Sequence, residues 1–119
     1  MRTIHNYKEL EVWKLSMELV TDIYILTRKF PKEELFNLTS QLRRAAVSIP
    51  SNIAEGFGRG TNPQIVNFLG ISQGSSYELE TQLMVSKNLE YITTEEAEQY
   101  LAKTIRVQKM LHRLQQNYS

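Results

Sequence analysis

Four basic side chains recur at three- and four-residue steps near the end of the sequence: Lys103, Arg106, Lys109 and Arg113. No acidic residue occurs between positions 103 and 119. At helical spacing these cations share one stripe, and clustered cations of this kind contact nucleic-acid phosphates. A second explanation stays open, because cations near a helix C-terminus also complement the helix dipole and keep the surface solvated. The stripe therefore predicts a phosphate-binding surface, and a purely structural role is the alternative.

Residues that would support enzymatic or metal chemistry are sparse. The chain has no cysteine, and neither His5 nor His112 follows a glutamate by three residues, as a di-iron bundle requires. Each histidine is expected at the surface. The glycine-rich segment 56–60 follows a helical pattern, so it predicts a helix end and not a phosphate-binding loop. Ser48 and Ser51 lack a base at a recognisable spacing. We expect no enzyme, metal site, cofactor or small-molecule substrate.

Composition narrows the remaining functions. The 119 residues include 14 basic and 13 acidic side chains, for a net charge of +1. This balance argues against coating nucleic acid by bulk charge, although a local patch is compatible with it. No apolar run approaches the roughly 20 residues of a membrane span, and the N-terminus lacks the apolar region of a secretion signal. The sequence predicts one cytoplasmic domain over residues 1–119, without membrane contact.

Apolar residues at steps of three and four predict four long helices. Pro31 ends the first, the second begins between positions 32 and 39, and Thr93 with Glu96 forms a capping box for the fourth. The expected helices cover about residues 7–30, 35–57, 63–90 and 94–118. Short connections between long helices make neighbours antiparallel. The fold class is therefore all-α, an antiparallel up-down-up-down four-helix bundle.

The segment Leu35–Gly60 has the most regular helical pattern and yet contains Pro50. A proline inside a helix removes one backbone hydrogen bond and crowds the carbonyl of Ala46, at a cost of roughly 3 kcal/mol. Packing by neighbouring helices must offset this cost. The sequence therefore predicts that the second helix is kinked at the proline and lies at the centre of the bundle.

The connection between the second and third helices sets their register. Gly56, Gly58 and Gly60 offer left-handed C-cap conformations, and Asn62 is the expected N-cap before Pro63. Small residues then cluster over 70–76 (GISQGSS), which favours close approach of another helix; an exposed, merely tolerated glycine face is the alternative.

A hairpin that turns near Gly60 brings together residues whose numbers sum to about 120. This register places Arg43 and Arg44 beside Tyr77, Glu78 and Glu80. We expect at least one partly buried arginine–carboxylate pair in this group, with a bidentate geometry possible. The alternative is that both partners remain solvated, in which case the pair contributes little.

Three blocks of the sequence resemble a known family: YKELEVW at 7–13, TSQLRRAAVSIPSNIAEG at 39–56 and ELETQL at 78–83. The family is the 23S rRNA intervening-sequence proteins, also called four-helix-bundle proteins and sometimes labelled ribosomal. The resemblance covers nearly the whole chain. Family members are similar to the accessory protein of diversity-generating retroelements, a pentameric basic bundle that binds nucleic acid. The resemblance therefore implies a homo-oligomer, with a pentamer as the expected state, and binding of RNA or DNA.

Two functions follow from these observations. The first is a non-enzymatic oligomeric bundle that binds structured RNA or DNA through the basic stripe. The second is a protein–protein adaptor or structural oligomer that binds no nucleic acid. Broad apolar faces on the first helix, with Leu15 and Ile25 outside both of its seams, fit the second function equally well.

Overall fold

Four long helices dominate the computed structural model, which describes residues 6–119. They are α1 (Glu11–Thr27), α2 (Leu38–Arg59), α3 (Asn62–Asn88) and α4 (Thr94–Tyr118). Two short 3-10 helices, η1 (Tyr7–Glu9) and η2 (Lys32–Glu34), precede α1 and α2. No strand occurs within residues 6–119, so the expected all-α fold is confirmed.

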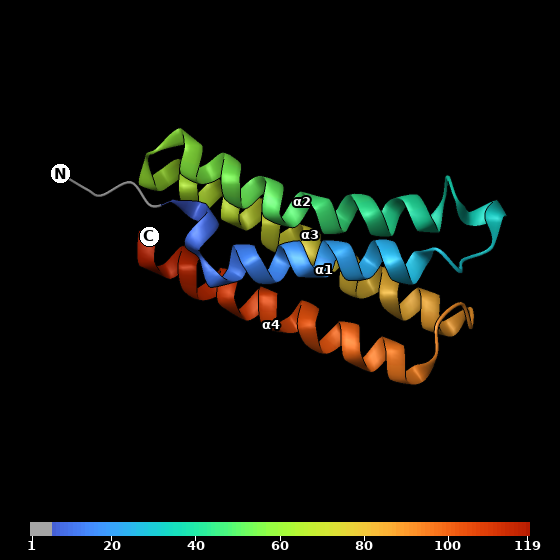
Figure 1. The fold of residues 1–119 in the computed structure, drawn as a ribbon. Coiled ribbons are helices and arrows are strands. Elements are labelled where there is room, and N and C mark those ends of the chain that lie inside the picture. Colours follow the sequence, from blue (N-terminus) through green and yellow to red (C-terminus); the bar gives the residue numbers. More distant parts are fainter. Residues whose placement is uncertain (1–5) are drawn as a thin grey trace.

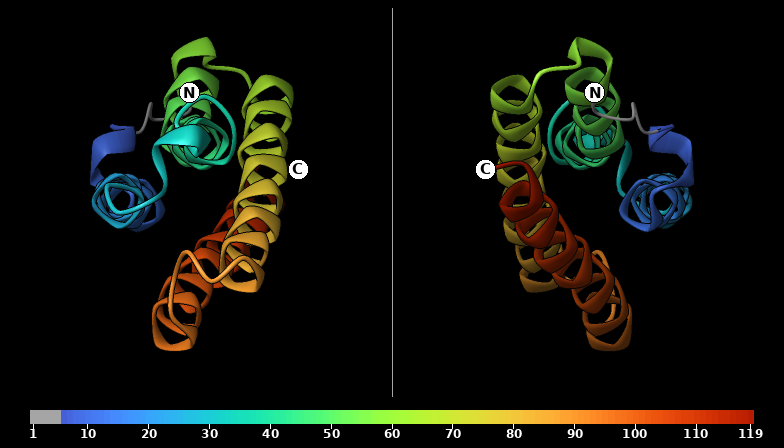
Figure 2. Two further views of the ribbon diagram at one scale, coloured as in Figure 1. Left: turned by 90° about the vertical axis from the view of Figure 1, so that its right-hand side faces the viewer. Right: turned by 90° about the vertical axis from the view of Figure 1, so that its left-hand side faces the viewer.

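Successive helices run in opposite directions along the long axis of an elongated bundle measuring 51 × 24 × 19 Å (Figure 1). Viewed along that axis, α2 lies between α1 and α3 (Figure 2). The fourth helix contacts α3 and α1, which brings the two ends of the chain's helical part together. The contact between α2 and α3 is the most extensive.

One apolar core runs through the bundle. Its largest fully buried apolar side chains come from all four helices, and they are Leu19, Ile23, Leu42, Ile49, Ile53, Ile65, Leu69, Leu79, Leu83, Val107 and Leu111. Helix α2 buries apolar residues from Leu38 to Phe57 and contacts both α1 and α3, as expected for the central helix. Leu35 was expected on the same stripe, but it lies before α2 and is exposed.

Pro50 is buried inside α2, and the helix continues past it to Arg59. Polar side chains gather around this point. The Ser72 hydroxyl of α3 donates to the Ile49 carbonyl at 2.8 Å, and the Asn52 amide donates to the Ser48 carbonyl at 2.8 Å. The Ser72 bond ties the backbone next to the proline to α3, and the Asn52 bond adds a contact within α2 across the proline. The kink that we predicted at Pro50 stays a prediction.

The α2–α3 connection is a tight turn. Gly60 has φ +81°, so the predicted left-handed C-cap is confirmed there, whereas Gly56 and Gly58 lie inside α2. The N-cap of α3 is Thr61 and not Asn62, because Thr61 is the last residue with an extended backbone before the helix. The capping box of Thr93 and Glu96 at the start of α4 is confirmed.

The predicted register of the α2–α3 hairpin is confirmed by side-chain contacts. The hydroxyls of Ser48 and Ser75 lie 2.7 Å apart, and Ser72 reaches Ile49. Ser72, Ser75 and Ser76 are all buried, so small residues do allow close helix approach in the middle of α3. Gly74 faces open space instead, which matches the alternative that we left open for the glycines.

Candidate nucleic-acid interface

Lys103, the first member of the predicted basic stripe, is not available to a phosphate. Its Nζ lies 2.7 Å from Asp22 Oδ2 and 3.3 Å from Glu18 Oε1, both on α1, and its side chain is 24% exposed. At 3.6 residues per turn, Lys103 points about 60° away from Arg106 and about 120° away from Lys109. The stripe is therefore narrower than predicted, because its first cation turns into the α1–α4 contact.

The charge state of Lys103 follows from that contact. Burial alone would lower the pKa of its ammonium group, since the charged form is desolvated. The hydrogen bond and charge of Asp22, followed by those of Glu18, act in the opposite sense and outweigh burial, so the pKa of Lys103 is raised. The side chain is a protonated structural link between helices.

The other three members of the stripe, Arg106, Lys109 and Arg113, are exposed on α4. None of the ion pairs formed within residues 6–119 includes any of them. Their positive charges are therefore not compensated by the part of the chain that the structure describes. They remain the candidate phosphate contacts.

Lys109 and Arg113 also line an open groove between α3 and α4, with a volume of about 520 Å³. The groove combines cations, amides, an aromatic ring and an aliphatic side chain, and its lining residues are Gln73, Tyr77, Ile105, Gln108, Lys109, His112 and Arg113. His112 is exposed, as predicted, whereas His5 lies outside the described residues. The groove is lined by two cations and by no acidic side chain, and sequence reasoning did not identify it.

Hydrogen bonds hold the amide side of the groove in place. The Gln108 amide donates to Glu80 Oε1 at 2.7 Å and approaches the Ser76 carbonyl at 3.4 Å. Gln73 in turn donates to the Gln108 carbonyl at 3.4 Å. These contacts link α3 and α4 beneath the groove. They also engage one oxygen of the Glu80 carboxylate, which is the acidic group in this network.

The predicted ion pair between α2 and α3 is not formed. Arg44 and Glu78 line the same polar cavity of about 300 Å³, as the hairpin register requires. However, none of the ion pairs within residues 6–119 joins Arg43 or Arg44 to Glu78 or Glu80. Arg44 and Glu78 are both exposed, and solvation of two exposed charges competes with pairing.

Arg43 turns away from α3 toward the first helix. Its Nε donates to Thr27 Oγ1 at 2.9 Å, and its guanidinium carbon lies 4.8 Å from the centroid of the Tyr24 ring. Stacking of a planar guanidinium on an aromatic ring accounts for this choice. The sequence pattern placed Arg43 near Glu80, but Glu80 is bound by Gln108 instead.

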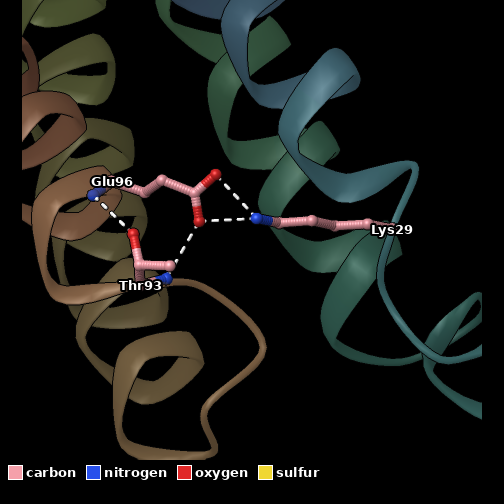
Figure 3. Close-up of polar contacts among 3 residues, drawn as sticks. All are labelled: Lys29, Thr93 and Glu96. Carbon is pink, nitrogen blue, oxygen red and sulfur yellow. Dashed lines mark hydrogen bonds and ion pairs between the residues drawn. The ribbon is translucent and has the colours of Figure 1, made fainter.

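Ion pairs concentrate between α1 and α4. Figure 3 shows that Glu96 joins the start of α4 to Lys29, just beyond the end of α1: its carboxylate accepts from Lys29 Nζ at 2.5 and 2.6 Å. The same carboxylate accepts from the Thr93 backbone N–H at 2.9 Å, which completes the capping box. The hydrogen bond from Lys29, and then that from the Thr93 backbone, lower the pKa of Glu96 below its usual 4.5.

This lowered pKa predicts a pH-dependent contribution to stability. Glu96 stabilises the fold fully above pH 4.5, its unfolded-state pKa, and this contribution is lost as the pH falls through the lower folded-state value. Glu96→Gln should therefore lower the melting temperature at pH 7, and the difference from wild type should shrink below pH 4.5. Thermal melts from pH 7 to pH 3 measure it. Glu98→Gln removes an exposed carboxylate from the same turn that forms none of the ion pairs within residues 6–119, so it should leave the melting temperature at pH 7 close to that of wild type.

Within residues 6–119 no group of three or more His, Asp or Glu side chains is placed to hold a metal ion. Over the same residues, none of the helices has the length and apolar character needed to cross a membrane.

The sequence model of the 23S rRNA-intervening sequence protein matches residues 8–113. The chain belongs to this family. The match spans all four helices up to the last turn of α4, so it includes every residue of the α3–α4 groove.

A solved structure supports the assignment. The chain is similar to the crystal structure of a protein with unknown function from the S23 ribosomal protein family of Bacteroides thetaiotaomicron VPI-5482. The two are 25% identical, with a TM-score of 0.79, and the alignment covers 87% of this chain and 97% of the other. No curated protein matches the sequence.

One signal in the sequence would have found the groove. The hydrogen bonds from Gln73 to Gln108 and from Gln115 to Val66 show that residues of α3 and α4 face each other when their numbers sum to about 181. The hairpin argument that we applied to α2 and α3 extends to the turn near residue 91. It would have placed Tyr77 opposite the stretch that begins at Ile105.

Proposed function

We propose that the protein is a non-enzymatic, oligomeric helical bundle of the cytoplasm that binds RNA or DNA through Arg106, Lys109 and Arg113. The observation that supports this function is the uncompensated positive charge on the exposed side of α4 beside the α3–α4 groove. Phosphate oxygens are the common counter-charge for clustered arginine and lysine side chains. The 23S rRNA-intervening sequence name of the family is consistent with this assignment.

Self-association would strengthen such binding, and we propose a homo-oligomer, with a pentamer as the first state to test. One copy carries a net charge of only +1. The three cations of a single copy therefore attract a polyanion only weakly. Copies arranged around a symmetry axis place several stripes close together, and their potentials add. The modest charge of the monomer is therefore compatible with nucleic-acid binding by the assembly.

A second function, that of a protein–protein adaptor or structural oligomer, has one specific observation in its favour. An open apolar groove of about 360 Å³ lies between α1 and α2, and its lining residues are Tyr7, Trp13, Met17, Val20, Val47, Pro50, Ser51 and Ala54. Met17 and Val47 are exposed there. Exposed apolar patches on a folded protein commonly mark contacts with other proteins.

Salt dependence separates the two functions. Purified, nuclease-treated protein is first sized by light scattering and then titrated into labelled RNA and duplex DNA at 50 and 200 mM salt. Three phosphate contacts give a log–log salt slope of about −2.7, so the affinity should fall about 40-fold over this range. If the protein is an oligomer that binds neither probe, the adaptor function is supported. If it is a monomer, self-association is contradicted in both proposals.

A further inference from the structure

We infer that the α3–α4 groove prefers single-stranded nucleic acid to duplex, with a base stacked on Tyr77 and neighbouring phosphates on Lys109 and Arg113. This inference rests on the proposed function and deepens it, because it names the form of nucleic acid that the same surface takes. It stands on the exposure of one aromatic ring, on the cations beside it and on the shape of the groove.

The Tyr77 ring is available for stacking. Its side chain is 53% exposed and lines the groove from α3. Six other aromatic side chains pair with one another within the bundle: Tyr7 with Trp13, Phe30 with Tyr91, and Phe57 with Tyr118. Among residues 6–119 neither a ring contact nor a hydroxyl hydrogen bond is formed by Tyr77. An exposed ring beside cations is the usual platform for an unpaired base, because every base has a π face.

The cations stand on the opposite wall. Lys109 and Arg113 are one turn apart on α4, which separates them by about 6 Å along the helix axis. Arg106 continues the row one turn earlier, outside the groove. The acidic residue next to Tyr77, Glu78, lines two hollows on the α2 side, one of which Tyr77 also lines, and it does not line this groove. A strand along α4 therefore meets positive charge beside the aromatic ring.

The groove shape distinguishes a single strand from a duplex. In a duplex the base faces are stacked on one another, so only the backbone and the base edges reach a protein surface without deformation. Such a partner would contact the exposed cations but would not stack a base on Tyr77. A single strand can turn a base into the hollow of about 520 Å³, where Ile105 supplies apolar contact and the Gln73 amide a polar edge. The extra contacts make the single strand the tighter ligand.

The test compares matched probes and matched variants of the full chain. Fluorescence anisotropy measures binding of a labelled 20-nucleotide oligouridine and of a 20-base-pair RNA duplex at one fixed salt concentration. We expect the single strand to bind at least tenfold more tightly. Tyr77→Ala should weaken single-strand binding by about five- to a hundredfold and change duplex binding by less than twofold.

Three further variants isolate the ring. Tyr77→Phe keeps the stacking face and should bind like wild type, whereas Tyr77→Leu keeps apolar bulk without a π face and should bind like Tyr77→Ala. Met84→Ala removes an equally exposed side chain, at 51%, from the same helix two turns away and should change nothing. Circular dichroism verifies that each variant is folded, and Tyr77→Leu serves if Tyr77→Ala is not.

The outcomes separate this inference from the proposed function. Equal affinity for both probes with no effect of Tyr77→Leu overturns the groove inference, while the phosphate-binding function stands. If Tyr77→Phe loses as much affinity for the single strand as Tyr77→Leu does, stacking is overturned in favour of a contact made by the hydroxyl. Absence of binding to either probe overturns the proposed function and the inference with it.

Discussion

Lys109→Glu combined with Arg113→Glu is expected to weaken the binding of RNA or DNA by at least about a hundredfold. Both side chains are exposed, and neither forms an ion pair within residues 6–119, so the change should leave the fold intact. It removes two of three proposed phosphate contacts and introduces two carboxylates that repel the backbone. The salt slope should become shallower by about 1.8. Anisotropy titrations at several salt concentrations measure both quantities.

The control changes net charge by the same amount elsewhere. Lys14 lies on α1 and Lys32 on η2, and both are exposed. Lys14→Glu with Lys32→Glu should retain most of the binding, because only the α4 surface is proposed to contact phosphate. Lys103→Gln should lower the melting temperature while binding persists, since Lys103 pairs with Asp22. Undiminished binding by the Lys109→Glu/Arg113→Glu protein would reject the α4 surface.

The second large effect is expected at Gly56, where helices α2 and α3 pack closely together. Gly56→Ala is expected to destabilise the protein by about 1–3 kcal/mol. A Cβ atom at Gly56 would lie 2.9 Å from Phe68 Cβ and 3.4 Å from the Ile65 Cα and carbonyl oxygen. These atoms belong to the backbone of α3 or are bonded directly to it, so no side-chain rotation relieves the clash. Helices α2 and α3 must separate locally, and the gain in helix propensity of about 1 kcal/mol offsets only part of this.

Gly74→Ala is the matched control for Gly56→Ala. Gly74 is also inside a helix, and no atom lies within 4 Å of where its Cβ would be. Here the propensity gain is unopposed, so the variant should be more stable than wild type by up to about 1 kcal/mol. Urea denaturation gives both free energies of unfolding. Equal stabilisation by both substitutions would show that α2 and α3 do not pack as tightly as the structure indicates.

Much of the fold could be predicted because its signals are local. The apolar steps along α2, the Thr93–Glu96 capping box and the left-handed Gly60 each depend on residues within one or two turns. The register of α2 against α3 also followed, since a short turn leaves a hairpin little freedom. The predicted N-cap of α3 was wrong by one residue. Thr61 and Asn62 are both good N-cap residues, so the local pattern does not choose between them.

The candidate site was predicted only in part. Arg106, Lys109 and Arg113 are exposed on α4 as expected, but their helical spacing does not reveal Tyr77 on the facing helix. Arg43 was assigned to a carboxylate on α3, whereas the Tyr24 ring and the Thr27 hydroxyl on α1 bind it. In each case the contact is made with a residue of another helix. Whether that residue lies within reach depends on how its helix is rotated about its own axis.

By itself the sequence determined four amphipathic helices, their turns and the all-α class, because helix periodicity and caps are set by residues three or four positions apart. The tertiary structure alone decided which charges remain free. Lys103 and Lys109 were assigned to the same basic stripe from the sequence, yet Lys103 meets Asp22, 81 residues away, while Lys109 faces an open groove. The reason is physical: the interaction energy of a charge depends on its distance from other charges in space, and only packing brings those charges together.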